Sequence, residues 1–218
     1  MRESGSHLIN PNPVNCSYAA LVACPGNPNT ACMSYPSLKN HFLIAMPQLD
    51  DPNFHHGVVW VVEHNAEGAM GLSINRPSSL TIENILDDLS IPHRGLQGHH
   101  QVVQGGPVRP ETGFILHPDT GEDWLGSHHL MDGLRLTTSK DVLEAIAAGR
   151  GPTRSLTALG YAGWEAGQLE QEMLDNAWLS VAADADTLFE VPLTERWQHS
   201  AASLGVDIRL LSGHAGHA

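Results

Sequence analysis

The sequence predicts a single globular domain in which individual α-helices accompany a mixed or antiparallel β-sheet. Three observations support this prediction. The 218 residues are 41% apolar and 16% charged, a balance that suits one packed core. Short apolar runs bounded by turn residues indicate strands, some of them joined as hairpins. Helical patterns occur singly between these runs, which does not fit a doubly wound parallel sheet.

The clearest strand pattern covers residues 58–62, where every residue is apolar and four are valine. Such a run is typical of a strand that is covered on both faces. A tight connection at 65–68 leads to a returning strand at 69–74, so this region is predicted to be a hairpin. Further strands are predicted at 42–46, 102–104, 114–117, 134–137, 156–161 and 178–182, with an edge strand at 208–211.

Four apolar residues at i, i+3, i+4 and i+7 predict an amphipathic helix over residues 82–89. A second helix is predicted between a capping Ser139 and Gly149. Further helices are predicted over 168–174 and after a capping Thr194. Loops are predicted for the polar, glycine-containing segments 93–101 and 118–132.

The sequence divides into three parts. Residues 1–37 are rich in Asn-Pro pairs, so we expect either a disordered extension or one that precedes the true start of translation at Met33. A lipoprotein signal ending at Cys24 is the alternative, but prolines interrupt its apolar stretch. Residues 38–211 form the predicted domain, and 212–218 a flexible tail.

Charge and cysteine usage exclude several classes of function. The chain has 24 acidic and 11 basic residues, a net charge of −13. Because DNA-binding surfaces neutralise phosphates with clustered Lys and Arg, direct nucleic-acid binding is disfavoured. No apolar run approaches the ~20 residues that span a bilayer, so we expect a soluble protein without a membrane partner.

All three cysteines lie within the first 32 residues. The predicted domain therefore has no disulfide, cysteine nucleophile or thiolate metal site. Its histidine pairs do not have the His-Glu-x-x-His spacing of a zinc site, and no metal site is expected.

A polar cluster follows the strand at 58–62. Glu63 and His64 place a carboxylate and an imidazole beside a buried strand, where such groups can carry out acid-base chemistry. Adjacent strand residues point to opposite faces, so we expect Glu63 alone to face a site, with His64 turned away. The structural alternative is that His64 and Asn65 satisfy backbone groups of the turn.

Asn75 and Arg76 lie at the end of the returning strand. An arginine there can grip a carboxylate or phosphate through paired hydrogen bonds, or it can pair with a structural acid such as Glu63. Ser73 lies in a sequence that approaches the Gly-x-Ser-x-Gly nucleophile elbow. The second glycine is missing, so Ser73 is expected to pack inside the strand.

Two further motifs contribute candidate ligand-binding residues. Gly105 and Gly106 precede a proline and would let a ligand approach the backbone, unless they form only a turn. Tyr161 and Trp164 are predicted on a tight turn after a strand. They would serve either as core or interface anchors or as a platform on which a ligand stacks.

Several short motifs follow one another in a specific order: FLIAMP at 42–47, EHN at 63–65, EGAMG at 67–71, NRP at 75–77, GGPV at 105–108, LH at 116–117, LGYAGWEAGQL at 159–169 and NAW at 176–178. Together they resemble the AlgH/YqgE family of bacterial proteins over about residues 38–211. Ser73 stands where the family pattern has an aliphatic residue.

The resemblance implies an α+β fold, a single compact domain built on a mixed, barrel-like β-sheet flanked by helices. It also implies a bacterial cytoplasmic location. The family is described as transcriptional regulators because of a link to alginate production. It offers no accepted enzymatic activity and no cofactor to carry over, so no cofactor is expected.

Three hypotheses for function follow. The leading one is a non-catalytic regulatory protein that binds a partner protein or a small anionic ligand through the face carrying Glu63, Asn75, Arg76 and the Gly105-Gly106 turn. The second is an enzyme of unknown substrate, with Glu63 or His64 as acid or base and Arg76 orienting an anion. The third, direct DNA binding, is disfavoured by the net charge.

Overall fold

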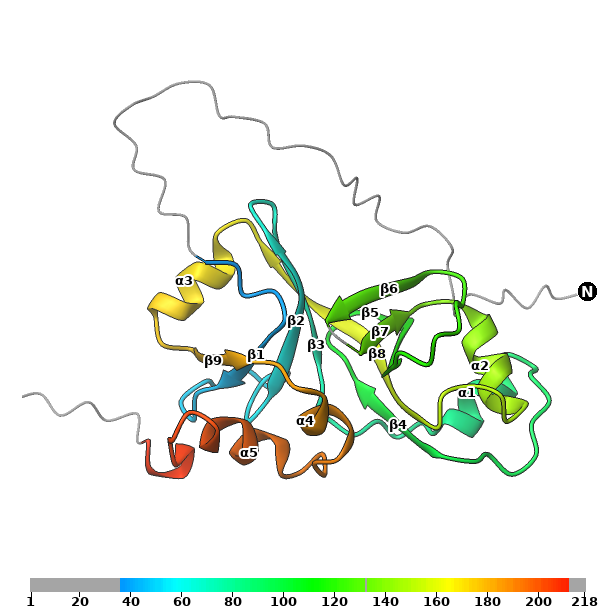
Figure 1. The fold of residues 1–218 in the computed structure, drawn as a ribbon. Coiled ribbons are helices and arrows are strands. Elements are labelled where there is room, and N and C mark those ends of the chain that lie inside the picture. The colour runs from blue at the N-terminus through cyan, green and yellow to red at the C-terminus, as the bar shows by residue number, and fades with distance from the viewer. Residues whose placement is uncertain (1–35, 132, 212–218) are drawn as a thin grey trace, which may run out of the picture.

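A computed structural model describes residues 36–131 and 133–211 of the chain (Figure 1). Most of the predicted extension at 1–37 and the whole predicted tail at 212–218 lie outside the described residues. The strands are β1 (His41–Ala45), β2 (Val58–Asn65), β3 (Gly68–Ser73), β4 (His99–Gln104), β5 (Val108–Pro118), β6 (Ser127–Met131), β7 (Leu134–Thr137), β8 (Arg154–Glu165) and β9 (Trp178–Ala182). The helices are α1 (Ile82–Asp88), α2 (Lys140–Ala147), α3 (Gln168–Leu174), α4 (Ala185–Phe189), α5 (Arg196–Ala202) and the short 3-10 helix η1 (Ile208–Leu210).

Nine strands among the described residues form one sheet, in the order β6-β7-β5-β8-β3-β2-β1-β9, with β4 also paired to β8. The sheet curls into a half-barrel, and helices pack around it (Figure 1). β4 and β8 are parallel, whereas β8 pairs antiparallel with β3 and β5. The predicted α+β fold with a mixed, barrel-like sheet is therefore confirmed.

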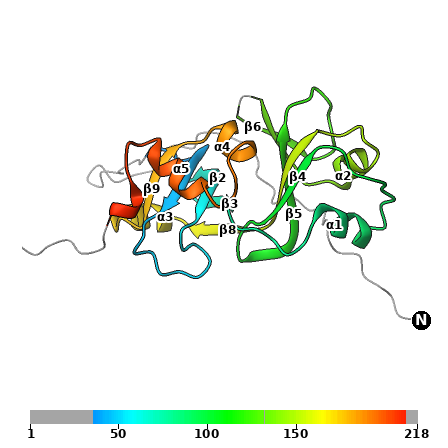
Figure 2. The ribbon, with the colours of Figure 1, turned by 90° about the horizontal axis from the view of Figure 1, so that it is seen from below.

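Strand β8 joins the two halves of the molecule. Its first part pairs with β4 up to Leu159 and with β5 up to Tyr161, and its last part, from Ala162 to Glu165, pairs with β3. Figures 1 and 2 show β1, β2, β3 and β9 on one side of this strand, with α3, α4 and α5, and β4 to β7 on the other side, with α1 and α2. A strand of 12 residues is needed to span both.

Three apolar clusters form the core. The largest includes Phe42, Trp60 and Leu116 and draws residues from both halves of the sheet. The second lies beneath α1 and α2, and the third lies beneath α3. Within the described residues, no helix is both long and apolar enough to cross a membrane.

The predicted hairpin and the helix at 82–89 are confirmed by β2, β3 and α1. Asn84 and Thr81 form a capping box at the start of α1: the Asn84 N–H donates to the Thr81 hydroxyl, and the Thr81 N–H donates to the Asn84 Oδ1 at 2.9 Å. The predictions of α3 and β9 match the observed bounds. In these segments the local sequence pattern and the tertiary packing agree.

Several predicted boundaries were wrong because strand pairing overrides local polarity. Strand β4 begins at His99, inside a predicted loop, because β8 offers it a parallel partner. Strand β6 likewise lies within the predicted loop at 118–132, where it pairs with β7. Residues 161–164 continue β8 instead of turning, because β3 lies alongside them.

Smaller corrections concern helix ends. Ser139 stands at the N-cap of α2, but its hydroxyl donates to the Asp141 carboxylate and makes no capping bond to the helix backbone. The cap of α5 is Glu195, not Thr194. The predicted edge strand at 208–211 is the 3-10 helix η1, whose Asp207 side chain accepts from the Arg209 N–H. Helix α4 was not predicted, because five residues are too few to show a helical repeat of apolar side chains.

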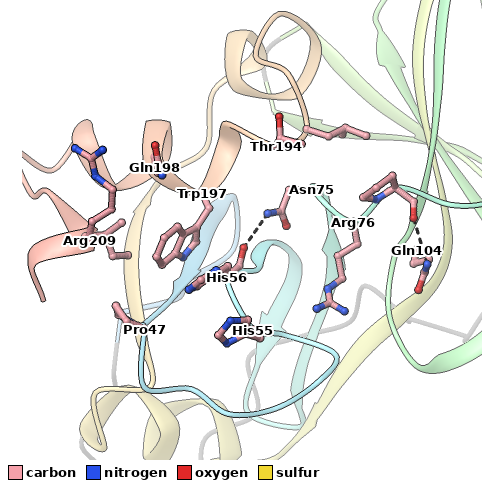
Figure 3. A pocket seen from close by; sticks show the side chains of 13 residues that line it. Pro47, His55, His56, Asn75, Arg76, Gln104, Thr194, Trp197, Gln198 and Arg209 are labelled. Atoms are coloured by element: carbon pink, nitrogen blue, oxygen red, sulfur yellow. Dashed lines mark hydrogen bonds between the residues drawn. The ribbon is translucent and has the colours of Figure 1, made fainter. Parts of the chain in front are cut away.

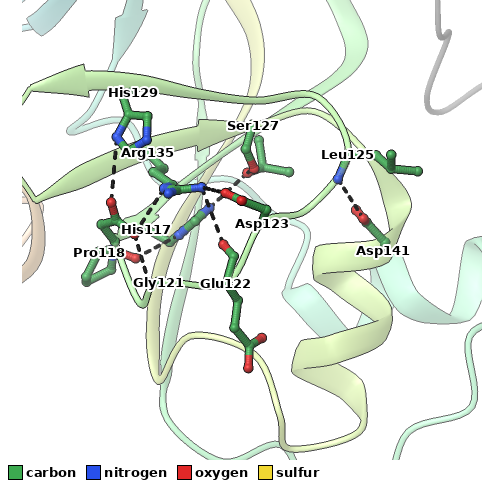
Figure 4. Close-up of polar contacts among 12 residues, drawn as sticks. His117, Pro118, Gly121, Glu122, Asp123, Leu125, Ser127, His129, Arg135 and Asp141 are labelled. Carbon is green, nitrogen blue, oxygen red and sulfur yellow. Dashed lines mark hydrogen bonds and ion pairs between the residues drawn. The ribbon is translucent and has the colours of Figure 1, made fainter.

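A polar cluster closes the end of the β5-β6-β7 sheet (Figure 4). His117 is fully buried, and its Nδ1 lies 2.9 Å from the Pro118 carbonyl oxygen, which can only accept. The neutral ring therefore carries its proton on Nδ1, and Nε2 accepts from the Thr137 hydroxyl at 2.9 Å. That leaves the Thr137 oxygen to accept from Ser127 at 2.6 Å. Nearby, Arg135 pairs with Asp119 at 3.0 Å.

The His117 cluster makes the stability of the fold depend on pH. Burial lowers the pKa of His117 below its ordinary value of 6.5, and the nearby Arg135 guanidinium lowers it further. As pH falls below 6.5, the unfolded chain takes up a proton at this position that the folded chain refuses, so stability is lost. The slope reaches at most ~1.4 kcal/mol per pH unit for one such histidine.

We predict that urea unfolding of the wild type between pH 7.5 and 5 shows this acid-side loss, and that His117→Gln flattens it. The exposed His128→Gln should leave the slope unchanged. Parallel pH profiles for the wild type and His117→Gln would contradict the assignment.

Candidate functional site

A pocket of about 700 Å³ lies beside α5, on the half of the molecule that carries β1 to β3 (Figure 3). Its wall comes from the β1–β2 connection, the segment after β3, Gln104 at the end of β4, and the region from Leu193 to Arg209. Asn75 and Arg76 line this pocket together with His55, His56 and Trp197. These segments are distant in sequence, and the sheet brings them together.

Asn75 fixes the loop that precedes β2. Its Oδ1 accepts from the Val58 N–H at 2.8 Å, and its Nδ2 donates to the His56 carbonyl at 2.9 Å. Arg76 reaches the same loop, since its Nη1 donates to the Pro52 carbonyl at 2.7 Å. Both side chains of the Asn-Arg-Pro motif therefore position the residues that face them across the pocket.

Arg76 retains its charge for a ligand. Among the described residues it makes no ion pair with a carboxylate, and the proposed partner Glu63 is paired elsewhere. The pocket wall contains no Asp or Glu within the described part of the chain. A guanidinium in such a wall can bind a carboxylate or phosphate through its remaining donors.

Three aromatic rings are stacked in the pocket. The His55 and His56 rings lie 3.9 Å apart at 29°, and His56 lies 4.1 Å from Trp197 at 31°. Trp197 is fixed by a 2.8 Å hydrogen bond from its Nε1 to the Ala45 carbonyl. Burial and the neighbouring His55 lower the pKa of His56, so both effects favour an uncharged ring.

Two further arginines lie in or next to this wall: Arg209 lines the pocket, and Arg196 directly precedes the lining residue Trp197. Arg209 is held by the Asp207 carboxylate, at 2.9 Å from Nε and 2.8 Å from Nη2, which balances its charge. Arg196 is fully buried, and within the described ranges it donates only to neutral acceptors: the carbonyls of Ile74, Leu188 and Val191 and the side chain of Gln101. Desolvation lowers its pKa to about 10, so it remains charged at neutral pH.

Glu63 and His64 are not part of this pocket. Glu63 forms an ion pair with Lys39 at 3.1 Å. His64 is buried: its Nδ1 accepts from the Leu38 N–H at 2.9 Å, so Nε2 carries the proton that is shared with Glu170 at 3.0 Å. A bulge at Val62 interrupts the regular alternation, yet the two side chains still have separate partners.

Gly105 and Gly106 lie against the protein's own backbone. A Cβ on Gly105 would lie 2.2 Å from the Gly160 carbonyl oxygen, and one on Gly106 would lie 2.1 Å from the Tyr161 carbonyl carbon. The Gly105 peptide also bonds on both sides, donating to Leu159 and accepting from Ser73, each at 2.7 Å. The close approach that these glycines permit is therefore to strand β8.

Trp164 is buried, and Tyr161 is half-buried against the apolar core. Tyr161 contacts Phe114 edge to face, with ring centroids 6.0 Å apart. Trp164 is 7% exposed, and its Nε1 donates to Glu172 Oε2 at 2.9 Å. Trp178 donates to the same oxygen at 2.8 Å, so one carboxylate from α3 ties together β8 and β9.

The structure thus brings together two of the seven candidate residues, Asn75 and Arg76, and places the other five elsewhere. Sequence reasoning missed His55, His56 and Trp197 as partners of Arg76. The adjacent histidines were visible, but only as a weak metal motif, and no local signal connects them to Trp197. Within the described residues, no group of three or more His, Cys, Asp or Glu side chains is arranged to hold a metal ion.

The protein is thus of an α+β class in which helices flank a curled half-barrel sheet. A pocket lined by arginine side chains lies beside α5. A family model described as AlgH-like matches residues 42–209, and the chain belongs to the AlgH family. The resemblance seen in the sequence motifs is confirmed.

Known relatives agree with this placement. The UPF0301 protein AlgH of Pseudomonas aeruginosa is 52% identical over 184 residues, which cover 83% of this chain and 96% of that protein. A UPF0301 protein of Thioalkalivibrio sulfidiphilus is 52% identical over 179 residues, with 82% and 96% coverage.

Solved structures agree as well. The solution structure of AlgH from P. aeruginosa has a TM-score of 0.66 at 48% identity and covers 90% of this chain and 100% of that one. A crystal structure of protein DIP2367 from Corynebacterium diphtheriae has a TM-score of 0.63 at 18% identity, covering 81% of this chain and 91% of that one, and shows the fold alone.

The backbone contact at Gly105 gives a stability prediction. Gly105→Ala should destabilise the protein by at least about 3 kcal/mol, because the added methyl group meets a backbone oxygen that cannot move aside. Gly113→Ala is the matched control in β5, since the nearest atom to its Cβ would be 4.0 Å away. Urea denaturation measures both, and equal effects of the two substitutions would contradict the structural role of Gly105.

Proposed function

We propose that this protein is a non-catalytic, cytoplasmic regulatory protein that binds a small anionic ligand in the pocket beside α5, with Arg76 as the group that contacts the anion. One observation carries the proposal: Arg76 lines a pocket of about 700 Å³ without an ion-pair partner among the described residues. Pockets of 300–1,000 Å³ are typical of small-molecule sites.

Electrostatics supports an anion over a cation or a neutral ligand. The chain as a whole has a net charge of −13, yet the pocket wall combines arginines and histidines without an acidic side chain in the described part of the chain. Arg196 adds a buried positive charge behind this wall, since it donates to the carbonyl of Ile74, which immediately precedes Asn75. A bound anion would compensate charge that the protein itself leaves unbalanced there.

The enzymatic alternative has less support. It requires Glu63 or His64 to act with Arg76, but neither residue lines the pocket, and both hydrogen-bond elsewhere. Direct DNA binding receives no new support, because the acidic net charge opposes a phosphate backbone.

A thermal-shift titration of the full chain tests the proposal, with inorganic phosphate, pyrophosphate and di- and tricarboxylates as probes. At about ten times its Kd, a ligand stabilises the folded state by ~1.4 kcal/mol, which raises Tm by about 3–6 °C in a chain of this size. Arg76→Gln should abolish the shift, whereas Arg150→Gln, which changes an exposed arginine outside the pocket, should retain it.

Two outcomes would overturn the proposal. One is that none of these anions shifts Tm. The other is that Arg76→Gln responds as strongly as the wild type. Unfolding of each variant without ligand provides the baseline, because Arg76 also donates to Pro52.

A further inference from the structure

We infer that the ligand of this pocket is a nucleoside monophosphate or a closely similar compound, in which a phosphate contacts Arg76 and a planar heteroaromatic ring stacks on His55. The inference rests on the proposed anion site and assigns the chemical class of its ligand.

The stacked rings provide the first argument. His55, His56 and Trp197 form a column with centroid separations of 3.9 and 4.1 Å, and Trp197 at one end is buried. The other end, His55, is exposed and lines the pocket. An exposed flat ring at the end of a column is a surface on which another flat ring stacks, and stacking accepts any nucleobase because every base has a π-face.

Hydrogen bonds of the protein itself hold this column of rings in place. His56 adopts a left-handed backbone conformation, with φ of 53°, which is uncommon for a residue other than glycine, although histidine adopts it more often than most. Asn75 restrains this residue through its hydrogen bonds to the His56 carbonyl and the Val58 N–H. The same short segment ends in Arg76, so the platform and the anion contact are positioned by adjacent residues.

Pocket size and neutral polar groups provide the second argument. A volume of about 700 Å³ exceeds what a lone phosphate or small carboxylate would fill. The wall also contains Gln104, Thr194 and Gln198, whose amides and hydroxyl can bond to sugar hydroxyls and base edges. Gln104 is held by a 3.2 Å bond from its Nε2 to the Pro77 carbonyl, which leaves its Oε1 available as an acceptor.

Isothermal titration of the full chain with matched compounds tests the inference. The four common nucleoside 5′-monophosphates are compared with the parent nucleosides, ribose 5-phosphate and inorganic phosphate. At least one nucleotide should bind about tenfold or more tightly than both its nucleoside and ribose 5-phosphate, since stacking and the phosphate contact each contribute.

Variants separate the two contacts. His55→Ala should weaken nucleotide binding about tenfold while leaving phosphate binding unchanged, and His55→Phe, which keeps a flat ring, should restore it. Arg76→Gln should weaken nucleotides and phosphate alike. His128→Ala, an exposed histidine outside the pocket, serves as the control and should bind like the wild type.

The possible failures are distinguishable. If ribose 5-phosphate binds as tightly as every nucleotide and His55→Ala has no effect, the ring assignment is wrong, although the anion site stands. If the nucleosides bind as tightly as the nucleotides, the phosphate contact at Arg76 is wrong. If none of the nucleotides, phosphates or carboxylates used in the titration and in the thermal-shift experiment binds, the ligand class and the proposed function both fall.

Discussion

The structure depends on a close backbone contact between the Gly105-Gly106 segment and strand β8 at Gly160. Cβ atoms on these glycines would lie within 2.5 Å of backbone atoms across the contact, so side chains are excluded there. The Gly105 N–H donates to the Leu159 carbonyl, and the Gly105 carbonyl accepts from the Ser73 N–H. These two hydrogen bonds link the contact to both halves of the sheet. Strand β8 can therefore pair with β4 and β5 along one part of its length and with β3 along the other.

The same contact positions the pocket. Directly before Gly105, the Gln104 N–H donates to the Arg76 carbonyl at 2.8 Å. The Ser78 N–H donates to the Val102 carbonyl at 3.1 Å. The segment that follows β3 is therefore held against β4, which sets where Arg76 can project. Asn75 and Arg76 then orient the loop that carries His55 and His56. The position of Asn75 and Arg76 thus depends on the backbone contact at Gly105. The stacked rings of His55, His56 and Trp197 depend in turn on Asn75 and Arg76.

The long motif at 159–169 contributes Trp164 to a structural contact with α3. Its Trp164 and the later Trp178 share one carboxylate oxygen of Glu172, so α3 is fastened to two strands that are not neighbours in the sheet. His64 and Glu170 add a further link, which joins α3 to β2. Trp164 is the residue of the motif that takes part in these links.

The sequence by itself determined the hairpin, helices α1 and α3, the class of fold and the family. In those segments periodicity, caps and turn residues act within a few positions of one another, so local physics is sufficient. It also identified Arg76 as an anion-binding candidate, with pairing to a structural acid such as Glu63 as the open alternative.

Only the tertiary structure decided which residues share a site. Polar strands β4 and β6 form because partners supply their hydrogen bonds, and no local pattern encodes a partner. Whether Gly105 faced a ligand or a strand depended on where β8 runs. The pocket unites Arg76, His55 and Trp197 from three separate segments, and contacts between segments distant in the chain are set by the packing of the whole sheet.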